Sequence, residues 1–441
     1  MAGEGIARFF RNSLRRRSSR RRDETQNVHR EESKPEATER PGERSSFPYS
    51  AGHFFFEYLV VVSLKKKLGE DYEPKITYQY PKRENLLRGQ REEEERLLQA
   101  IPLFCFPDGN NWAPLTQYTS ETFSFVLTNV DGSRKIGYCR RLLILDEVEK
   151  RRQISAAVIY PFMQSLRESS FPAPGKTVTI TSFIPESGTE LIELTRPLDS
   201  RLEHVEFSAL LQHLSPEKIL RIFASIVLER RIAFLAKELS TLSKCIHAAA
   251  ALLYPFTWEH TYIPVVPESL IPTVCSPTPF MLGIQKRYLE QVLDQPMEEV
   301  LLVDLCEGEL LISVGDEEEI LPAKLQSEML SSLQMKSNNI QTSEEVNAHV
   351  SDTFVQFFVQ TVGNYTAHIK WNKSGQGAFQ ERPFCKALAS KTSRKFLKRF
   401  VKTQMFSLFT QEAERNKASQ EGYFQKKVSE FQEQKKQRRA S

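Results

Sequence analysis

The sequence has little of what builds metal centres and disulfide frameworks. Its six cysteines are scattered over 441 residues, and no CxxC pair or Cys/His cluster occurs. Because zinc sites and disulfide scaffolds need closely spaced ligands, we expect no metal and no cofactor. The lack of a disulfide framework also indicates a reducing compartment, so we expect a cytoplasmic protein.

Long apolar runs are absent too. The longest stretches, such as Ala248–Phe256, are far shorter than the roughly 18 residues that a membrane-spanning helix needs. The amino terminus has no apolar run of the kind found in secretory signals. The net charge of +4 is too small to make the whole surface attract nucleic acid, and no RRM, KH or zinc-finger pattern occurs. We therefore expect no nucleic-acid partner.

The signatures of covalent catalysis are also missing. No dinucleotide-binding fingerprint, GxSxG, HExxH or kinase signature occurs. The nearest approach to a phosphate loop is Pro174-Gly175-Lys176-Thr177, but a Walker loop needs a glycine where Ser170 stands. We interpret His213 and His247 as structural residues of helical stretches. We expect no catalytic residue and no small-molecule substrate, and a P-loop enzyme stays open as an alternative.

Residues 1–48 form a separate zone that we expect to be disordered. Eight arginines and one glutamate lie between Met1 and Arg22, and a stretch rich in Ser, Glu and Pro follows. Such a segment buries too little apolar surface to offset the entropy of ordering it. Arg15, Arg16 and Arg17 are candidates for contact with anionic membrane or an acidic partner. A mitochondrial presequence and a solvated basic tail are the alternatives.

The first folded part, from residue 49, shows strand and hairpin signals. His53–Leu64 is a continuous apolar run that favours a buried strand, and Glu84–Ala100 favours a helix. Glu121–Arg141 predicts a hairpin, because Asp131-Gly132 separates two strand-like arms and glycine tolerates a positive φ.

Helices and strands then alternate as in a parallel α/β layer. Ser215 followed by Pro216 predicts a helix start, and Ser240 predicts the cap of a second helix that ends at Tyr254. Further on, the sequence becomes mostly helical to Phe431. The expected strands are Arg231–Ala236, Thr261–Val266, Val300–Asp304 and Glu309–Val314.

Ser393–Thr410 predicts one amphipathic helix. Its basic arc includes Lys395, Lys398 and Arg399, and an apolar face lies opposite. The arc fits contact with anionic membrane or an acidic partner, and equally the solvated face of a packed helix.

A stretch rich in aromatic residues and proline runs from Tyr254 to Gly283. Proline fixes loop geometry, and rigid aromatic side chains make good binding anchors. We expect Trp258, Tyr262, Pro264 and Glu268 to face a protein partner or to shape the loop. Alanine at Trp258 is expected to weaken partner binding without unfolding the chain.

These residues resemble one family. Leu228-Glu229-Arg230-Arg231-Ile232, Leu252-Leu253-Tyr254-Pro255-Phe256, Trp258 and Tyr262–Pro267 are similar to the central part of the tripartite DENN module. Pro277–Gly283 continues the match, and residues 50–425 resemble the module as a whole, in its second class.

The resemblance implies an α/β fold in three parts: a longin-like α/β lobe, a doubly wound α/β lobe and a mainly helical third part. Its expected bounds are 49–145, 146–292 and 293–425, between the segment 1–48 and a charged tail, 426–441. The implied function is guanine-nucleotide exchange on a Rab GTPase of the Rab-nine, late-endosomal type, without covalent chemistry. In the family the GTPase sits between the two α/β lobes. We expect a cytoplasmic protein with peripheral association with endosomal or other intracellular membranes.

The chain departs from the family pattern near Leu143. In the family, the first lobe has another apolar strand after the one that matches Ile136–Arg141, whereas here Leu142-Leu143 runs straight into Ile144–Val148. A lobe without that strand has an unpaired sheet edge and an incomplete core. A Rab-binding effector or scaffold with weak or no exchange activity is therefore the second hypothesis.

Overall fold

The structure is a computed structural model of the whole chain. It describes 56–66, 72–83, 88–108, 121–129, 131–141, 169, 172, 176–184, 188–195, 205–334, 342–373, 375–415 and 422–440. The chain divides into two compact units. Unit 1 comprises Met1–Leu115, Val126–Gly137 and Pro267–Leu270, and unit 2 comprises Thr116–Phe125, Tyr138–Val266 and Ile271–Ser441. The expected disordered segment 1–48 and the departure near Leu143 lie outside the described residues.

Unit 1 contains a two-stranded antiparallel sheet and one helix. β1 (Leu59–Lys66) pairs with β2 (Tyr72–Tyr80), and β2 packs against α2 (Arg88–Cys105). The expected strand is present, but its expected burial is wrong, because Leu59 and Val61 are 42% and 39% exposed. The run is apolar enough for a buried strand, yet the described residues give β1 a single partner strand. The helix is confirmed, although it continues through Pro102 instead of ending at Ala100.

The predicted hairpin is confirmed. β3 (Glu121–Thr128) and β4 (Arg134–Arg141) form a two-stranded sheet, and Gly132 in the turn has a φ of 87°. A side chain also supports the turn, since Asp131 Oδ1 accepts a 2.8 Å hydrogen bond from the backbone N–H of Ser133. The signal was local, so sequence alone sufficed.

A second antiparallel pair, β5 (Thr177–Ile184) and β6 (Gly188–Thr195), belongs to unit 2. Thr177 therefore begins a strand. A Walker loop leads directly into a helix, whose amino end binds the phosphates. The described part of this segment thus argues against the P-loop alternative.

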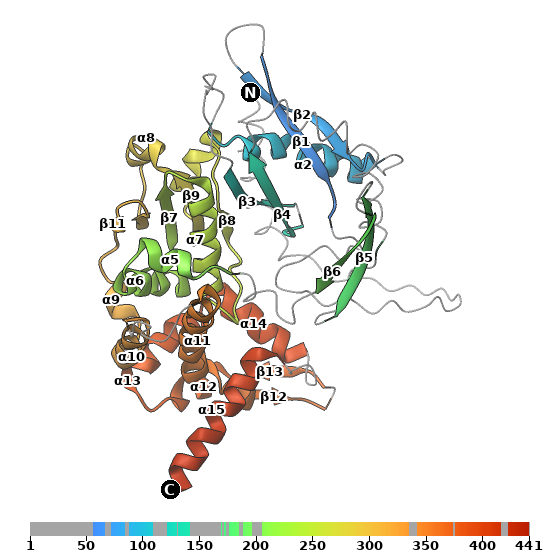
Figure 1. Cartoon of the computed structure of the whole chain (residues 1–441). Helices are drawn as coiled ribbons and strands as arrows, with labels where there is room; N and C mark the ends of the chain where they lie inside the picture. The colour runs from blue at the N-terminus through green and yellow to red at the C-terminus, as the bar shows by residue number, and fades with distance from the viewer. Residues whose placement is uncertain are drawn as a thin grey trace, which may run out of the picture. The chain divides into compact units, whose positions relative to one another are not determined.

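A five-stranded sheet forms the centre of unit 2 (Figure 1), in the order β11-β10-β7-β9-β8. β10, β7, β9 and β8 run parallel, and β11 is antiparallel to β10. The chain starts at central β7, moves to one side for β8 and β9, and crosses to the other side for β10. This order confirms the doubly wound α/β layer. The strands are β7 (Arg231–Ala236), β8 (Thr261–Ile263), β9 (Phe280–Gln285), β10 (Val300–Asp304) and β11 (Glu309–Ile312).

Helices cover this sheet and are specified partly by local signals. α6 (Pro216–Val227) begins as predicted, with Ser215 Oγ accepting from the backbone N–H of Lys218. α7 (Leu239–Ala251) packs against β7 and β9. Ser240 is not its cap, because the helix begins one residue earlier and Ser243 donates to the carbonyl of Ser240. The remaining elements here are α5 (Ser208–His213), η1 (Glu268–Cys275), η2 (Lys286–Tyr288) and α8 (Leu289–Leu293).

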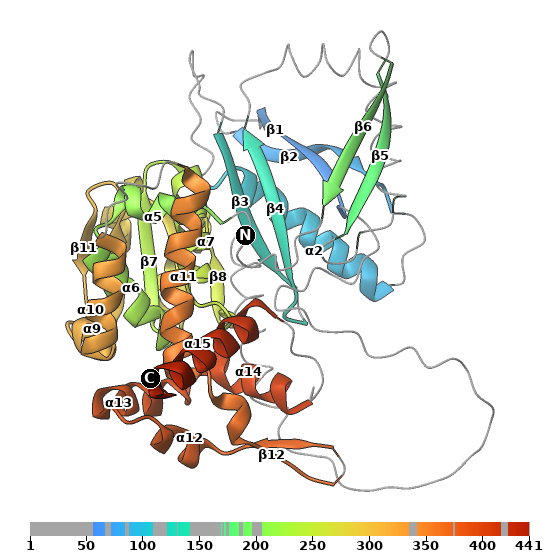
Figure 2. The ribbon, with the colours of Figure 1, turned by 60° about the horizontal axis from the view of Figure 1, so that its bottom comes forward.

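The carboxyl-terminal part of unit 2 is mainly helical (Figure 2), with α11 beside α10 and α15 packed on α11. A short hairpin, β12–β13, interrupts the helices and was not expected. The predicted single helix over 393–410 is wrong, since α13 ends at Phe400 and α14 begins at Gln404. The elements are α9 (Glu317–Ile320), α10 (Ala323–Gln334), α11 (Ser343–Val362), η3 (Tyr365–His368), β12 (Ile369–Trp371), β13 (Gly377–Phe379), α12 (Glu381–Ala387), α13 (Lys391–Phe400), α14 (Gln404–Arg415) and α15 (Tyr423–Ala440).

Aromatic side chains hold the helical part to the sheet layer. Phe256, which follows α7, lies 4.9 Å from the rings of both Phe358 on α11 and Phe400 on α13. Phe223 on α6 also contacts α11, with its ring 5.3 Å from that of Phe357. Edge-to-face contacts of this kind add about 0.5–1.5 kcal/mol each beyond the area that they bury.

Among the described residues, no helix combines the length and the apolarity that crossing a bilayer requires.

β8 ends at Ile263, three residues earlier than predicted, where the chain passes close to β9. The backbone N–H of Val266 donates to the carbonyl of Gly283 at 2.7 Å. A Cβ at position 283 would lie 1.9 Å from the carbonyl oxygen of Pro264, so only glycine allows this approach.

We predict that Gly283→Ala destabilises the fold by about 1–3 kcal/mol, because the added methyl group displaces the backbone of Pro264. Chemical denaturation would measure the loss. Gly89→Ala is the control, since a Cβ at Gly89 on α2 has no atom within 4 Å. That helical substitution should be neutral or add up to about 1 kcal/mol. An equally stable Gly283→Ala variant would contradict the close approach.

Candidate functional site

The strongest polar cluster among the described residues lies where β7 and β10 begin. α6 ends just before β7, and Glu229 follows it with a left-handed φ of 53°. Glu299, directly before β10, has a φ of 49°. Left-handed backbone costs a residue with a Cβ about 1–2 kcal/mol, and glycine usually takes such a position after a helix. The side chain of Glu229 makes contacts that offset this cost, whereas that of Glu299 pairs with Arg231 at the surface.

The Glu229 carboxylate caps α14. Its two oxygens accept from the backbone N–H groups of Gln404 and Met405, each at 2.8 Å. The next N–H, of Phe406, donates to Thr403 Oγ1 at 3.3 Å. The first N–H groups of a helix have no partner inside it, and a negative charge there is favourable. The break between α13 and α14 is therefore stabilised by a residue from the sheet layer.

The Glu229 carboxylate is ionised despite its burial. Burial alone would raise the pKa of Glu229, but hydrogen bonding by His260 and by the two backbone N–H groups outweighs it and lowers the pKa. His260 Nε2 lies 3.1 Å from Glu229 Oε2. The glutamate thus joins α14 to the loop that precedes β8.

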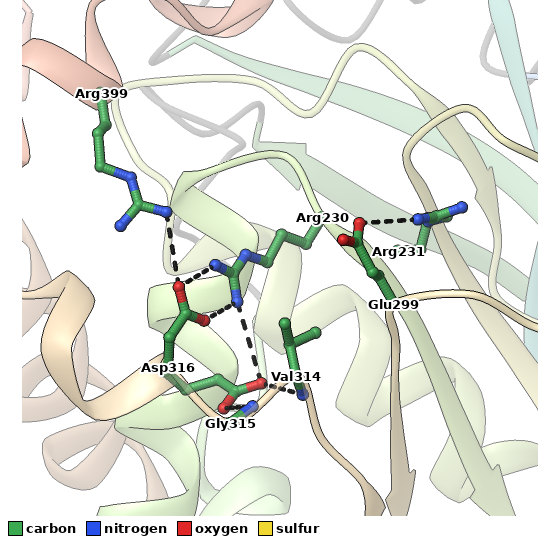
Figure 3. A network of polar contacts seen from close by, with 8 residues as sticks. Arg230, Arg231, Glu299, Val314, Gly315, Asp316 and Arg399 are labelled. Atoms are coloured by element: carbon green, nitrogen blue, oxygen red, sulfur yellow. Dashed lines mark hydrogen bonds and ion pairs between the residues drawn. The ribbon is translucent and has the colours of Figure 1, made fainter.

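Arg230 makes the second connection (Figure 3). Its guanidinium donates two hydrogen bonds to the carboxylate of Asp316, at 2.6 and 2.7 Å. Arg399 of α13 approaches the same carboxylate at 3.8 Å. The hydrogen bonds from Arg230 are the main cause of a lowered pKa at Asp316. Two-point pairing of this kind fixes the direction as well as the distance of the contact.

Glu317 fixes the segment that carries Asp316. Its buried carboxylate accepts from the backbone N–H groups of Val314 and Gly315, at 2.8 and 2.9 Å, and lies 4.0 Å from Arg230. Arg231 instead pairs with Glu299 at 3.1 Å. Glu299 is 77% exposed, so that pair contributes little to stability.

Three of the four residues predicted at the partner surface are buried. Trp258 is 2% exposed, and its Nε1–H donates to the carbonyl of Thr261 at 3.1 Å. Tyr262 is 4% exposed, and its hydroxyl lies 2.8 Å from His247 Nδ1. Pro264 is buried against Gly283. The burial of Trp258 leads us to expect that alanine there destabilises the fold.

Glu268 is the exposed member of the four. It begins η1, and its backbone N–H donates to the carbonyl of Pro107 at 3.1 Å. Trp258 precedes β8, Tyr262 lies in it and Pro264 follows it. As partner contacts, all four residues stay a prediction.

His247 and His213 hold structural positions, as expected. His247 hydrogen-bonds to Ser124 Oγ at 2.7 Å as well as to Tyr262, and burial lowers its pKa to about 4. His213 Nδ1 lies 3.0 Å from the carbonyl oxygen of Leu305. His247 is therefore neutral at pH 7 and has both ring nitrogens in use, which leaves it unsuited to proton transfer.

On α13, the interpretation as a packed helix is confirmed for the apolar side. Phe396, Leu397 and Phe400 are buried, whereas Lys395, Lys398 and Arg399 are exposed. Arg15, Arg16 and Arg17 lie outside the described residues.

Sequence reasoning missed the cluster around Glu229 and a second one at the carboxyl ends of the strands. There, Asp304 is 2% exposed and lies 3.0 Å from Lys286, which also pairs with Glu307 at 2.7 Å. The sequence contained one signal for each cluster. Asp304 is an acid at the end of an apolar strand, and Glu229 is an acid directly before two arginines. Within the described part of the chain, no group of three or more His, Cys, Asp or Glu residues could hold a metal ion.

Unit 2 thus combines a doubly wound α/β layer with a mainly helical extension, and Glu229 and Arg230 connect the two. Residues 74–142 match the uDENN domain, 138–308 the DENN (AEX-3) domain and 379–427 the dDENN domain. The chain belongs to the DENN-domain family.

Curated relatives agree along the full length. DENN domain-containing protein 2D of Mus musculus is 63% identical over 468 residues, which cover 100% of this chain and 99% of that protein. Its Homo sapiens counterpart is also 63% identical, with 100% and 98% covered. DENN domain-containing protein 2B of Mus musculus is 46% identical over 85% of this chain and 36% of that protein. The first alignment is longer than the 441 residues of the chain, so the mouse 2D protein has residues without a counterpart here.

We predict that Glu229→Ala lowers the free energy of unfolding by about 1–3 kcal/mol, because two N–H groups of α14 lose a charged acceptor. Glu229→Gly should lose about 1 kcal/mol less, since glycine relieves the left-handed backbone. Chemical denaturation of the two variants and the wild type gives both differences.

The same experiment repeated at lower pH tests the charge. A carboxylate whose pKa is lowered by folding stabilises fully above its unfolded pKa, about 4.3, and loses that contribution as the pH falls through its folded value. The difference in free energy of unfolding between the wild type and Glu229→Ala should therefore become smaller below about pH 4. A difference that is constant in pH would mean that the charge has no part in the cap.

Proposed function

We propose that this protein is a guanine-nucleotide exchange factor for Rab GTPases, of the Rab-nine-like, late-endosomal type. The observation that carries the proposal is the match to all three parts of the DENN module, in order, in a chain that is 63% identical to DENN domain-containing protein 2D. We further propose that it works in the cytoplasm, peripherally on endosomal or other intracellular membranes.

Exchange requires no covalent chemistry. A GTPase holds its nucleotide through switch segments and Mg²⁺, and picomolar affinity corresponds to about 16 kcal/mol. An exchange factor must therefore bind the open, nucleotide-free GTPase far more tightly than the loaded one. Rigid surfaces achieve this better than mobile ones, because less entropy is lost on binding.

The contacts of Glu229 with α14 and His260 support such rigidity within unit 2. These short charged contacts connect the sheet layer, α14 and the loop of Trp258. In the proposal, Trp258, Tyr262 and Pro264 keep the loop in one shape, and Glu268 contacts the GTPase directly. This division of roles follows from their burial.

The second candidate is a Rab-binding effector or scaffold. The departure near Leu143 favours it, together with the residues that the mouse 2D protein has and this chain lacks. Exchange needs both selective binding and opening of the switches, whereas an effector needs binding alone.

The exchange assay uses purified Rabs loaded with fluorescent GDP. We expect the full chain to accelerate GDP release from a Rab-nine-type GTPase by about tenfold or more, equal to about 1.4 kcal/mol of barrier. A small GTPase from outside the Rab family is the control. Binding without faster release would identify an effector, and no binding to any Rab, whether loaded or nucleotide-free, would refute both candidates.

Glu268→Lys tests the contact residue in the same assay. We expect a lower exchange rate at unchanged melting temperature, because the side chain is exposed. Glu290→Lys makes the same charge change at an exposed position on α8 and should leave the rate unchanged. Trp258→Ala is unsuitable for this purpose, since truncation of a buried tryptophan costs about 3–5 kcal/mol of stability. Equal rates for both charge variants would remove Glu268 from the interface.

Insertion after Leu143 of an apolar strand of the kind that the family pattern has there tests the incomplete lobe. We expect faster exchange and a higher melting temperature, because the insert completes a sheet edge and its core. An insert of the same length made of Gly and Ser is the control. No gain in either quantity would mean that the departure near Leu143 has no functional consequence.

A further inference from the structure

The exposed side of α13 is strongly basic. Residues 382–402 contain eight Lys or Arg residues and no Asp or Glu. Of those that lie on or just after α13, five are exposed. These five residues, named here the α13 basic face, are Lys391, Lys395, Lys398, Arg399 and Lys402.

Little of this charge is compensated. Arg399 lies 3.8 Å from Asp316, which Arg230 also binds. Glu381, at the start of α12, is the nearest acid along the chain. For the four lysines of the α13 basic face, no ion pair occurs within the residues that the structure describes. Their charges are therefore free to act on a partner.

The apolar side of α13 is already occupied. The ring of Phe396 lies 5.3 Å from that of Phe357, and the ring of Phe400 lies 4.9 Å from that of Phe256. All four rings are buried. An interfacial amphipathic helix inserts its apolar face into the lipid, and α13 has no such face available. Binding through α13 must therefore depend on charge alone.

The composition of the surface decides between two anionic partners. Every exposed residue from 382 to 402 is Lys, Arg, Pro, Ala, Ser or Thr, without an aromatic or large aliphatic side chain. Protein interfaces obtain most of their affinity from Trp, Tyr and Arg anchors in pockets. A row of flexible lysines without anchors suits a flat anionic surface, where each contributes independently of exact geometry.

We propose that the α13 basic face binds the anionic surface of a lipid membrane by electrostatic attraction without insertion. The chemistry recognised is a dense layer of phosphate and carboxylate headgroups. Each lysine strengthens binding about fivefold at moderate salt, and the attraction falls within a Debye length of the surface. The proposal does not require exchange activity, so the two stand or fall separately.

Sedimentation of the full chain with vesicles tests it. Vesicles of phosphatidylcholine with phosphatidylserine should bind the protein, and vesicles of phosphatidylcholine alone should not. The variant with Lys391, Lys395, Lys398 and Lys402 changed to Gln should bind about six hundredfold less, which is about fivefold for each lysine. A matched variant loses the same charge at exposed lysines elsewhere: Lys65, Lys324, Lys435 and Lys436. It should bind almost as well as the wild type.

Two outcomes would overturn the proposal. The wild type could fail to bind the anionic vesicles, which would leave an acidic protein as the partner of this face. The α13 variant could bind as well as the wild type, which would move the contact elsewhere, and Arg15→Gln, Arg16→Gln and Arg17→Gln together would show whether it moves to the amino terminus. Should the four-lysine variant not fold, Lys398→Gln with Lys402→Gln gives the same comparison at about a twenty-five-fold loss.

Discussion

A single buried carboxylate, that of Glu229, connects the parts of unit 2. It accepts from two backbone N–H groups at the start of α14 and approaches His260 in the loop before β8. Those N–H groups need an acceptor because no helix supplies one for its own first turn. Its neighbour Arg230 pairs with Asp316, which Arg399 also approaches. Two adjacent residues thus hold the sheet layer, the helical extension and a loop together.

The contacts of Glu229 and Arg230 give a structural role to the segment from Leu228 to Ile232, which resembles the DENN family. Each of its three charged side chains contacts another side chain or backbone group in the described structure. Glu229 also keeps a left-handed backbone where glycine would be less strained. The tertiary contacts of Glu229 offset that strain, because its carboxylate caps a helix that lies far along the chain.

Several elements were predictable because their signals are local. The β3–β4 hairpin followed from Asp131-Gly132, and the start of α6 followed from Ser215-Pro216. The errors arose where distant parts decide. Periodicity predicted one helix over 393–410, yet the chain breaks at Val401–Thr403, where Glu229 caps the next helix. The sequence left open whether Trp258 faces a partner or shapes the loop, and in the structure its side chain is 2% exposed.

By itself, the sequence determined the class of fold, the alternation of helices and strands in the sheet layer, the family likeness and the absence of metal and nucleophile motifs. Those properties depend on residues near one another along the chain. Only the tertiary structure decided which charges are used and which are free. The physical reason is that the role of a charged side chain depends on the groups that surround it in space. Glu229 and the backbone N–H groups that donate to it are separated by about 175 residues along the chain.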